Sequence, residues 1–194
     1  MDTRLAKESD ILQITDIMNH YIQSSVATFR TEVLPASAIV ENYLALRDQG
    51  FPYLVAVREN SSFVLGYAYA SGYRMPSHKA YCHTVEITVF VHPEHQTIGV
   101  GTMLLRKLLY MLKNPDSLQD WALSSAPVVS EVLCIMALDP DGREAGYGLR
   151  DWYINFGFEE VGRLKRVGFK FGKWIDTLIL QMSLKDSEGI EGMS

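Results

Sequence analysis

The sequence predicts an α/β (α+β) fold in which helices flank a central mixed, mostly antiparallel, twisted sheet. Stretches whose apolar residues recur every three or four positions alternate with short runs rich in β-branched and aromatic residues. Two of those runs flank a hairpin-type turn, which predicts an antiparallel pair. A strand, a helix and another strand then follow one another directly, an order that favours a parallel pair in the same sheet.

Two helices are expected first, ahead of any strand. Ser9 and Asp10 can cap a helix whose apolar residues recur at helical spacing as far as Ile22. Pro35 suits the first turn of a second helix, which Gly50 ends.

Three strands and a helix are expected next. Residues 53–57 and 63–70 have strand composition, and the sequence RENSS between them favours a hairpin turn. A third strand is expected over about 81–91, followed by a helix over about 99–113.

The C-terminal third completes the sheet. Residues 114–130 lack clear periodicity and are interpreted as an insertion or an extended loop. A buried strand over 131–138, a short helix over 148–157 and two closing strands over 158–167 and 174–184 follow.

Length and composition indicate one ordinary domain over 1–184 with a flexible polar tail over 185–194. The 194 residues are 47% hydrophobic and 21% charged, enough to bury a sizeable core. A net charge of −5 gives no bulk attraction to nucleic acid or to anionic lipid. Neither a secretory signal nor a membrane span is recognised, so a cytoplasmic protein is expected.

The cysteines and histidines do not suggest a metal site. Cys82 and Cys134 stand outside any CxxC or Cys/His cluster and are interpreted as two buried thiols. His83, His92 and His95 lack metal-ligand spacing, so no metal is expected.

A glycine-containing loop separates the third strand from the helix that follows it. Pro93 ends the strand, and Gly99 and Gly101 leave backbone N–H groups uncovered at a helix start, where a diphosphate could bind. No lysine follows Gly101, which excludes a P-loop, and Leu104 stands where a Rossmann fingerprint needs its third glycine. Two glycines alone are also compatible with a plain tight connection.

The loop nevertheless resembles a known signature. The sequence QTIGVG at 96–101 is similar to the Gln/Arg-x-x-Gly-x-Gly/Ala motif of the GNAT acetyltransferase superfamily. Further segments resemble the phosphinothricin / methionine sulfoximine acetyltransferase-like branch in its usual order, over roughly residues 3 to 184. These segments are NHYI (19–22), ATFRTE (27–32), YLVA (53–56), GYAYA (66–70), YCHTVEITVFV (81–91), HQTIGVG (95–101) and GFKFGKWIDT (168–177).

The resemblance implies a GNAT fold and acetyl-coenzyme A as cosubstrate. The positions it implies for binding that molecule are Val89, Phe90, Val91, Gln96, Thr97, Gly99, Val100, Gly101 and Thr102. The chain departs from the branch at 114–130, which is longer than expected. It departs again at 138–146, where the usual Asn-Asp-Pro is missing, and no asparagine contact to the cofactor is therefore inferred.

Two residues are candidates for proton transfer. Glu86 lies within an apolar strand, where a carboxylate is costly to bury without a partner. A structural salt bridge or an edge position would also explain it, whereas the resemblance implies a general base. Tyr153, in YINFGF, matches the tyrosine that the resemblance implies as general acid, and aromatic core packing is the alternative.

Basic and aromatic residues could bind a small acceptor. Arg74 is the first candidate to pair with a carboxylate, because its guanidinium can be bidentate. Lys79 and Tyr81 follow in the same loop, which could instead be merely solvated. The resemblance places Phe29 and Arg30 in a segment that lines the pocket.

The leading hypothesis is an N-acetyltransferase for the α-amino group of a small amino acid or a toxic analogue such as phosphinothricin, methionine sulfoximine or methionine sulfone. A different amine acceptor on the same fold and a non-catalytic acetyl-coenzyme A-binding module are the alternatives. The branch also implies a homodimer.

Overall fold

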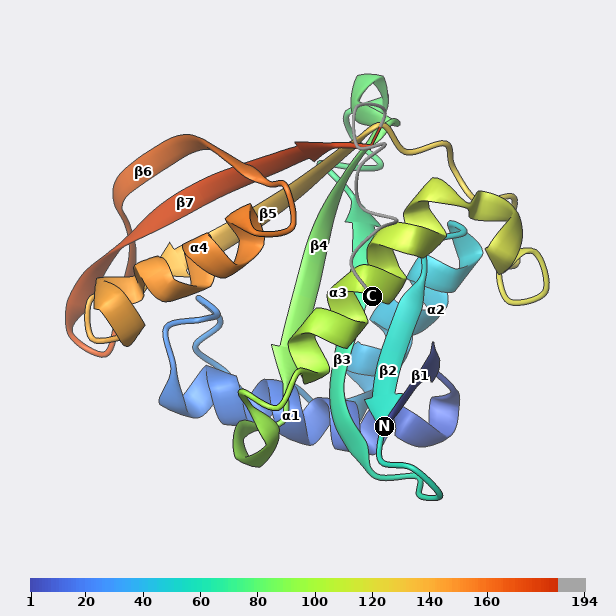
Figure 1. Ribbon diagram of the computed structural model, residues 1–194, viewed down its shortest axis with the longest axis horizontal. Coiled ribbons are helices and arrows are strands. Elements are labelled where there is room, and N and C mark those ends of the chain that lie inside the picture. The colour runs from blue at the N-terminus through green and yellow to red at the C-terminus, as the bar shows by residue number, and fades with distance from the viewer. Residues whose placement is uncertain (185–194) are drawn as a thin grey trace.

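The computed structural model describes residues 1–184. This part of the chain contains one seven-stranded sheet (Figure 1). The strand order is β1-β2-β3-β4-β5-β7-β6, and only the β4–β5 pair is parallel. The strands are β1 (Asp2–Leu5), β2 (Tyr53–Val57), β3 (Val64–Gly72), β4 (Thr84–Val91), β5 (Glu131–Leu138), β6 (Glu159–Lys170) and β7 (Lys173–Ser183). The α-helices are α1 (Ile11–Ser24), α2 (Ala36–Asp48), α3 (Val100–Lys113) and α4 (Tyr147–Ile154). The predicted mixed, mostly antiparallel sheet flanked by helices is confirmed.

Helices cover both faces of the sheet. Residues opposite one another in an antiparallel pair point to the same face, so Tyr69 and Thr88 share a face. On that face α1 and α2 pack, and the Tyr21 ring of α1 lies 4.9 Å from the Phe90 ring. Helix α3 covers the opposite face of β2, β3 and β4, where the absence of a side chain at Gly66 lets Leu104 approach (Figure 1).

The expectation that two helices precede any strand is wrong, because β1 comes first and pairs with β2. The four residues DTRL form a segment too short and too polar to show a strand pattern.

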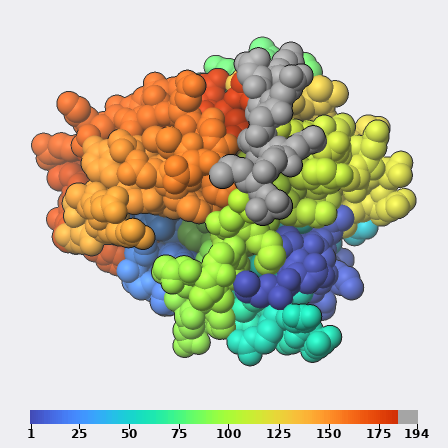
Figure 2. Space-filling view, in the orientation of Figure 1, coloured from blue at the N-terminus to red at the C-terminus, as the bar shows by residue number. Residues whose placement is uncertain are grey.

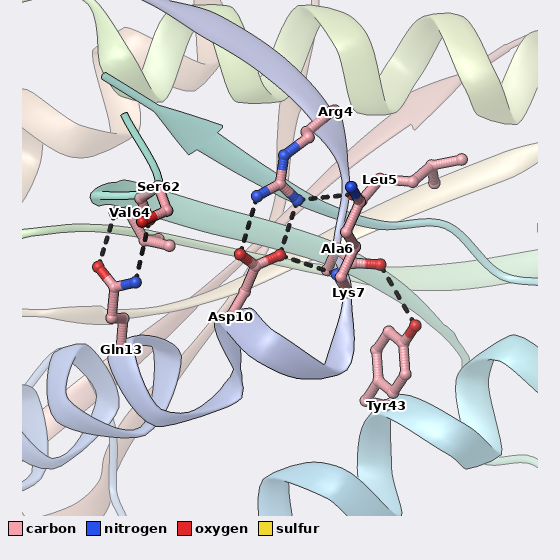
Figure 3. Close-up of polar contacts among 9 residues, drawn as sticks. All are labelled: Arg4, Leu5, Ala6, Lys7, Asp10, Gln13, Tyr43, Ser62 and Val64. Carbon is pink, nitrogen blue, oxygen red and sulfur yellow. Dashed lines mark hydrogen bonds and ion pairs between the residues drawn. The ribbon is translucent and has the colours of Figure 1, made fainter. Parts of the chain in front are cut away.

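The Asp10 side chain does not cap α1 as expected. Its carboxylate instead accepts bonds from the Arg4 guanidinium at 2.7 and 2.8 Å and from the Lys7 amide at 2.8 Å (Figure 3). Asp10 thereby ties the edge strand to the first helix.

The third strand is shorter than expected. It begins at Thr84 rather than at about Tyr81, because Tyr81 belongs to a 3₁₀ turn over Lys79–Tyr81. Cys82, expected to be buried, is exposed beside this turn, whereas Cys134 on β5 is buried.

The segment 114–130, predicted as an insertion or an extended loop, packs against the core. A 3₁₀ turn spans Pro115–Leu118, and Leu118 and Trp121 are buried. The Arg47 side chain of α2 donates a 2.7 Å hydrogen bond to the Trp121 carbonyl oxygen. The segment thus connects α3 to β5 while covering the C-terminal end of α2.

The last two strands form a longer hairpin than expected, and β6 contains a bulge. The pairing jumps from Leu164 to Gly168 along β6, and Arg166 in between has φ of +54°. Asp176 of β7 accepts the Arg166 amide at 2.8 Å, which holds the bulge in place. The tail at 185–194, expected to be flexible, lies outside the described residues.

Strands β4 and β5 separate soon after they begin (Figure 1). They pair only through 84–86 on β4 and 131–133 on β5. Beyond Glu86 and Leu133 the two strands diverge, which leaves the rest of β4 unpaired on the side facing β5. Glu86 stands at this opening in the sheet.

No helix within residues 1–184 combines the length and apolar character that crossing a membrane requires.

Candidate active site

Glu86 lies at the point where β4 and β5 separate. It is opposite Leu133, the last paired residue of β5, and it shares the α1/α2 face of the sheet with Thr88. Burial raises the pKa of its carboxyl above the ordinary value. Among residues 1–184 no ion pair includes this carboxylate, so the salt-bridge alternative fails. A half-buried carboxylate with a raised pKa is a stronger base than an exposed one.

Tyr153 is buried on the other face of the sheet, where its ring packs against Trp152 and Phe158. Its side chain, on α4, is 4% exposed and hydrogen-bonded to Cys134 of β5, the residue after Leu133. Burial raises the pKa of Tyr153 well above its usual range, and it raises the pKa of Cys134 to about 12. The charge of Glu86 contributes to the Cys134 shift, which places all three groups near one another. Glu86 and Tyr153 therefore lie on opposite faces of the sheet, close to the point where β4 and β5 separate.

The glycine loop presents backbone amides at the start of α3. Gly99 has φ of +90° and Thr97 has φ of +64°, so the chain turns sharply just before the helix. The first hydrogen bond of α3 runs from the Met103 amide to the Gly99 carbonyl oxygen at 3.0 Å. The backbone amides that precede Met103 therefore make no hydrogen bond within the helix. A side chain at Gly99 would meet no atom within 4 Å. This open cradle at the positive end of a 14-residue helix fits a diphosphate.

The Gln96 side chain holds the loop in shape. Its amide donates a 2.7 Å hydrogen bond to the Tyr21 hydroxyl, which in turn donates a 2.7 Å bond to the Val91 carbonyl at the end of β4. Gln96 was predicted as a cofactor-binding residue, and in this structure its side chain connects the loop to α1. The other predicted positions lie in the part of β4 that does not pair with β5 (Val89–Val91), in the loop (Thr97 and Gly99) and at the start of α3 (Val100–Thr102).

Trp152 is a site residue that sequence reasoning missed. Its indole Nε1 donates to the Thr102 hydroxyl at 3.3 Å, and its ring lies 3.5 Å from where a side chain on Gly101 would begin. Figure 2 shows α4 (orange) and the start of α3 (light green) on the same side of the molecule. No local pattern marked Trp152, because the contact joins residues about fifty positions apart.

A cavity of about 130 Å³ lies on the α1/α2 face of the sheet, the face that Glu86 also occupies. Tyr69 lines this cavity. Burial is the main reason that the pKa of Tyr69 is raised, and the charge of Glu86 raises it further. Arg30 also lines the cavity. The full lining is Met18, Arg30, Leu34, Ala38, Ile39, Asn42, Tyr53, Tyr67 and Tyr69. The sequence GYAYA could have indicated it, since alternate residues of a strand share a face.

The predicted acceptor-binding residues fall into two groups. Arg30 lines the cavity, and the neighbouring Phe29 ring packs against Gly168 of β6. Arg74, Lys79 and Tyr81 are exposed on the loop between β3 and β4, and none of the three belongs to the described cavity lining. Arg74 has φ of +54°. The structure thus places one group in the cavity wall and the other on the loop that leads into the strand of Glu86.

In the described part of the chain, no cluster of His, Cys, Asp and Glu side chains is arranged to hold a metal ion.

Comparison with known proteins gives consistent matches. The acetyltransferase (GNAT) family model matches residues 14–123. A phosphinothricin N-acetyltransferase of Alcaligenes faecalis is 35% identical over 182 residues, which cover 93% of this chain and 81% of the relative. An L-methionine sulfoximine/L-methionine sulfone acetyltransferase of Salmonella typhimurium is 27% identical over 186 residues, 96% of each chain. The crystal structure of a phosphinothricin acetyltransferase from Sinorhizobium meliloti in complex with acetyl-coenzyme A has a TM-score of 0.76 to this structure at 26% identity. The superposition covers 94% of this chain and 87% of the Sinorhizobium chain.

Proposed function

The chain belongs to the GNAT acetyltransferase family, and from that premise we propose that its acceptor is the α-amino group of a small amino acid or of an analogue such as phosphinothricin, methionine sulfoximine or methionine sulfone. The enzyme is an N-acetyltransferase that uses acetyl-coenzyme A. The observation that carries the proposed acceptor is the position of Glu86, on the face of the sheet that holds the small cavity lined by Arg30. A small, polar acceptor suits that volume.

Acetyl-coenzyme A, when bound, supplies the acetyl group as a thioester. We assign its diphosphate to the amides from Gln96 to Thr102 and its pantetheine arm to the unpaired edge of β4 over Val89–Val91. The open space at Gly99 and the separation of β4 from β5 support this assignment. Trp152 would form the wall of this binding site on the α4 side.

Proton transfer is assigned to Glu86 and Tyr153, the two groups close to the point where β4 and β5 separate. Glu86 accepts a proton from the acceptor amine, directly or through water, since an ammonium has no lone pair with which to attack a carbonyl. Tyr153 keeps its proton because its pKa is raised, and it can donate that proton to sulfur on the α4 face. The acceptor therefore approaches from the α1/α2 face and the thioester from the α3/α4 face.

Charged side chains are assigned to the acceptor's carboxylate. Arg74 is the first candidate, with Lys79 and Tyr81 on the same loop, because an exposed guanidinium can close on a carboxylate with two hydrogen bonds. Phe29 and Arg30 line the approach from the other side.

Two further features complete the proposal. The protein acts in the cytoplasm, consistent with its free cysteines, and it acts as a homodimer.

The deciding experiment measures thiol release with a panel of amines. Turnover is expected with phosphinothricin, methionine sulfoximine or methionine sulfone, and not with a polyamine or with a peptide N-terminus. Arg74→Ala should raise KM for carboxylate-bearing acceptors by roughly tenfold or more, because a charge-assisted pair is lost. Turnover of the polyamine alone would reject the amino-acid assignment, and an unchanged KM in the variant would reject Arg74 as anchor.

A further inference from the structure

The Tyr67 hydroxyl is buried without a hydrogen-bond partner. Its side chain is fully buried on β3, and no donor or acceptor in residues 1–184 pairs with the phenolic oxygen. A buried hydroxyl that pairs with nothing is destabilising, and such groups are uncommon in native proteins. A ligand that pairs with the hydroxyl would explain why it is retained.

Tyr67 is one of the residues that line the 130 Å³ cavity. Tyr53, Tyr67 and Tyr69 form a stack there, with ring centroids 5.0 to 6.4 Å apart. Tyr69 is hydrogen-bonded to Thr88 and Asn42, whereas Tyr67 is not paired. Of the side chains that line the cavity, Tyr67 is therefore the one whose buried polar atom has no partner among residues 1–184.

The cavity lining favours a group that carries oxygen acceptors. Burial raises the pKa of Tyr53 and Tyr67 well above the usual range, so both phenols stay protonated and can donate. Arg30 provides the positive charge at this site, and it opposes the upward shift of the pKa of Tyr67. The lining contains no carboxylate that could form an ion pair with a cationic group of the ligand. Met18, Leu34 and Ile39 supply apolar contact for a short methylene chain.

We propose that this cavity is a subsite for the oxidised end of the acceptor's side chain, a sulfone, sulfoximine or phosphinate group, whose oxygen accepts a hydrogen bond from Tyr67. The inference rests on the proposed function, because it assigns a side-chain position to an acceptor whose amine lies near Glu86. Tyr67 then discriminates between an oxidised acceptor and its unoxidised counterpart. An acceptor without such an oxygen leaves the hydroxyl unpaired.

The test compares two acceptors that differ only in oxygen, methionine and methionine sulfone, in the wild type and in Tyr67→Phe. The wild type should prefer the sulfone. The variant should lose about tenfold in kcat/KM for the sulfone and keep its value for methionine, because only the sulfone uses the hydroxyl. Equal losses with both acceptors would show that Tyr67 acts through packing alone, and unchanged values with both would also overturn the subsite.

Tyr43→Phe is the matched control. The Tyr43 hydroxyl is also buried, but it donates a 3.2 Å bond to the Ala6 carbonyl (Figure 3). Tyr43→Phe should lower the melting temperature and leave the sulfone preference intact, whereas Tyr67→Phe should not lower the melting temperature, since it removes an unpaired polar atom. A clear loss of stability in Tyr67→Phe would mean that the fold itself uses the hydroxyl, and this result would overturn the subsite.

Failure of the proposed function is distinguishable from failure of the subsite. If the wild type acetylates neither methionine nor its sulfone, the amino-acid assignment fails. Calorimetric titration with methionine sulfone in the presence of coenzyme A then decides the subsite. Binding to the wild type that is about tenfold weaker in Tyr67→Phe supports it. Absent binding, or equal binding to both proteins, overturns it.

Discussion

Glu86 shows how the position of one residue in a strand sets its chemistry. Its neighbours Val85 and Ile87 are buried beneath α3, while the carboxyl stands on the other face where β5 departs. Burial raises its pKa because the charged form loses hydration, and no ion pair among the described residues offsets that loss. The same carboxylate is therefore a stronger base than an exposed one and a less favourable charge to bury.

Glu86→Gln separates these two consequences. Because the pKa is raised in the folded state, the folded protein binds more protons than the unfolded chain between the ordinary and the raised pKa. The free energy of unfolding falls as pH rises through that window. Glutamine removes this cost, so the melting temperature at neutral pH should not fall. The value of kcat should fall about 10² to 10⁴-fold if Glu86 is the base. Steady-state kinetics and thermal unfolding across pH 5 to 9 check both.

The control for Glu86→Gln is acetyl-coenzyme A affinity, which calorimetry should find unchanged. A loss of kcat within a few-fold would mean that bulk water deprotonates the amine and that Glu86 has no proton-transfer role.

The α1–α2 loop, residues 25–35, is an element whose shape depends on a distant hairpin. The Lys170 ammonium, at the end of β6, donates 2.7 Å hydrogen bonds to the carbonyl oxygens of Ser25 and Thr28. A side chain on Gly168 would begin 2.3 Å from the Phe29 ring, so only glycine fits there. Because Arg30 follows in the same loop and lines the cavity, the β6–β7 hairpin positions one wall of the candidate acceptor site.

Lys170→Met should loosen this loop. It keeps an apolar stem and removes the ammonium, leaving two carbonyl oxygens without their donor, so the free energy of unfolding should fall by about 1–3 kcal/mol. Hydrogen exchange of the amides in 25–34 should accelerate, and KM for the acceptor should rise while acetyl-coenzyme A affinity stays unchanged. Chemical denaturation and exchange monitored by mass spectrometry measure these effects.

Lys173→Met is the matched control on the same hairpin. Lys173 pairs with Asp141 at the surface, where ion pairs contribute little, so neither stability nor exchange in 25–34 should change. Identical behaviour of the two variants would contradict a role for Lys170 in holding the loop.

At the scale of the whole molecule, the β6–β7 hairpin exposes an unusual amount of apolar surface. Large side chains there are between 47% and 58% exposed, namely Val161, Leu164, Val167, Phe169, Phe171 and Trp174. Two of them, Phe169 and Trp174, pack against each other with ring centroids 5.1 Å apart. Exposed apolar side chains gathered on one element are typical of an interface, and they support the proposed homodimer.

Light scattering at micromolar concentration should therefore give twice the 21.9 kDa mass of one chain. Replacing both Phe169 and Trp174 by serine should shift the mass to that of the monomer, because the buried apolar area of the interface is reduced. Leu12→Ser, a change at an exposed leucine of α1, serves as the control and should leave the dimer intact. A monomeric wild type would refute the dimer.

Local pattern by itself determined most of the elements and the glycine loop before α3. Helical spacing marked α1, α2 and α3, and strand composition marked β2, β3 and β5, because these periods follow from backbone geometry and solvent exposure. The two glycines of the loop and a carboxyl in an apolar strand were equally visible, since each departs from what a local segment normally tolerates. Strand β1 was missed because it is a short polar edge strand held by β2 and by the Arg4–Asp10 pair.

Only the tertiary structure decided which distant residues meet. The Tyr153–Cys134 bond, the Trp152 contact with Thr102 and the Lys170 bonds to the α1–α2 loop join residues from 19 to 145 positions apart. The cavity forms because two helices cross β2 and β3 over three tyrosines, and the unpaired state of Tyr67 follows from that packing. Periodicity reports which face of a segment is buried. It carries no information about the atoms that the buried face will contact.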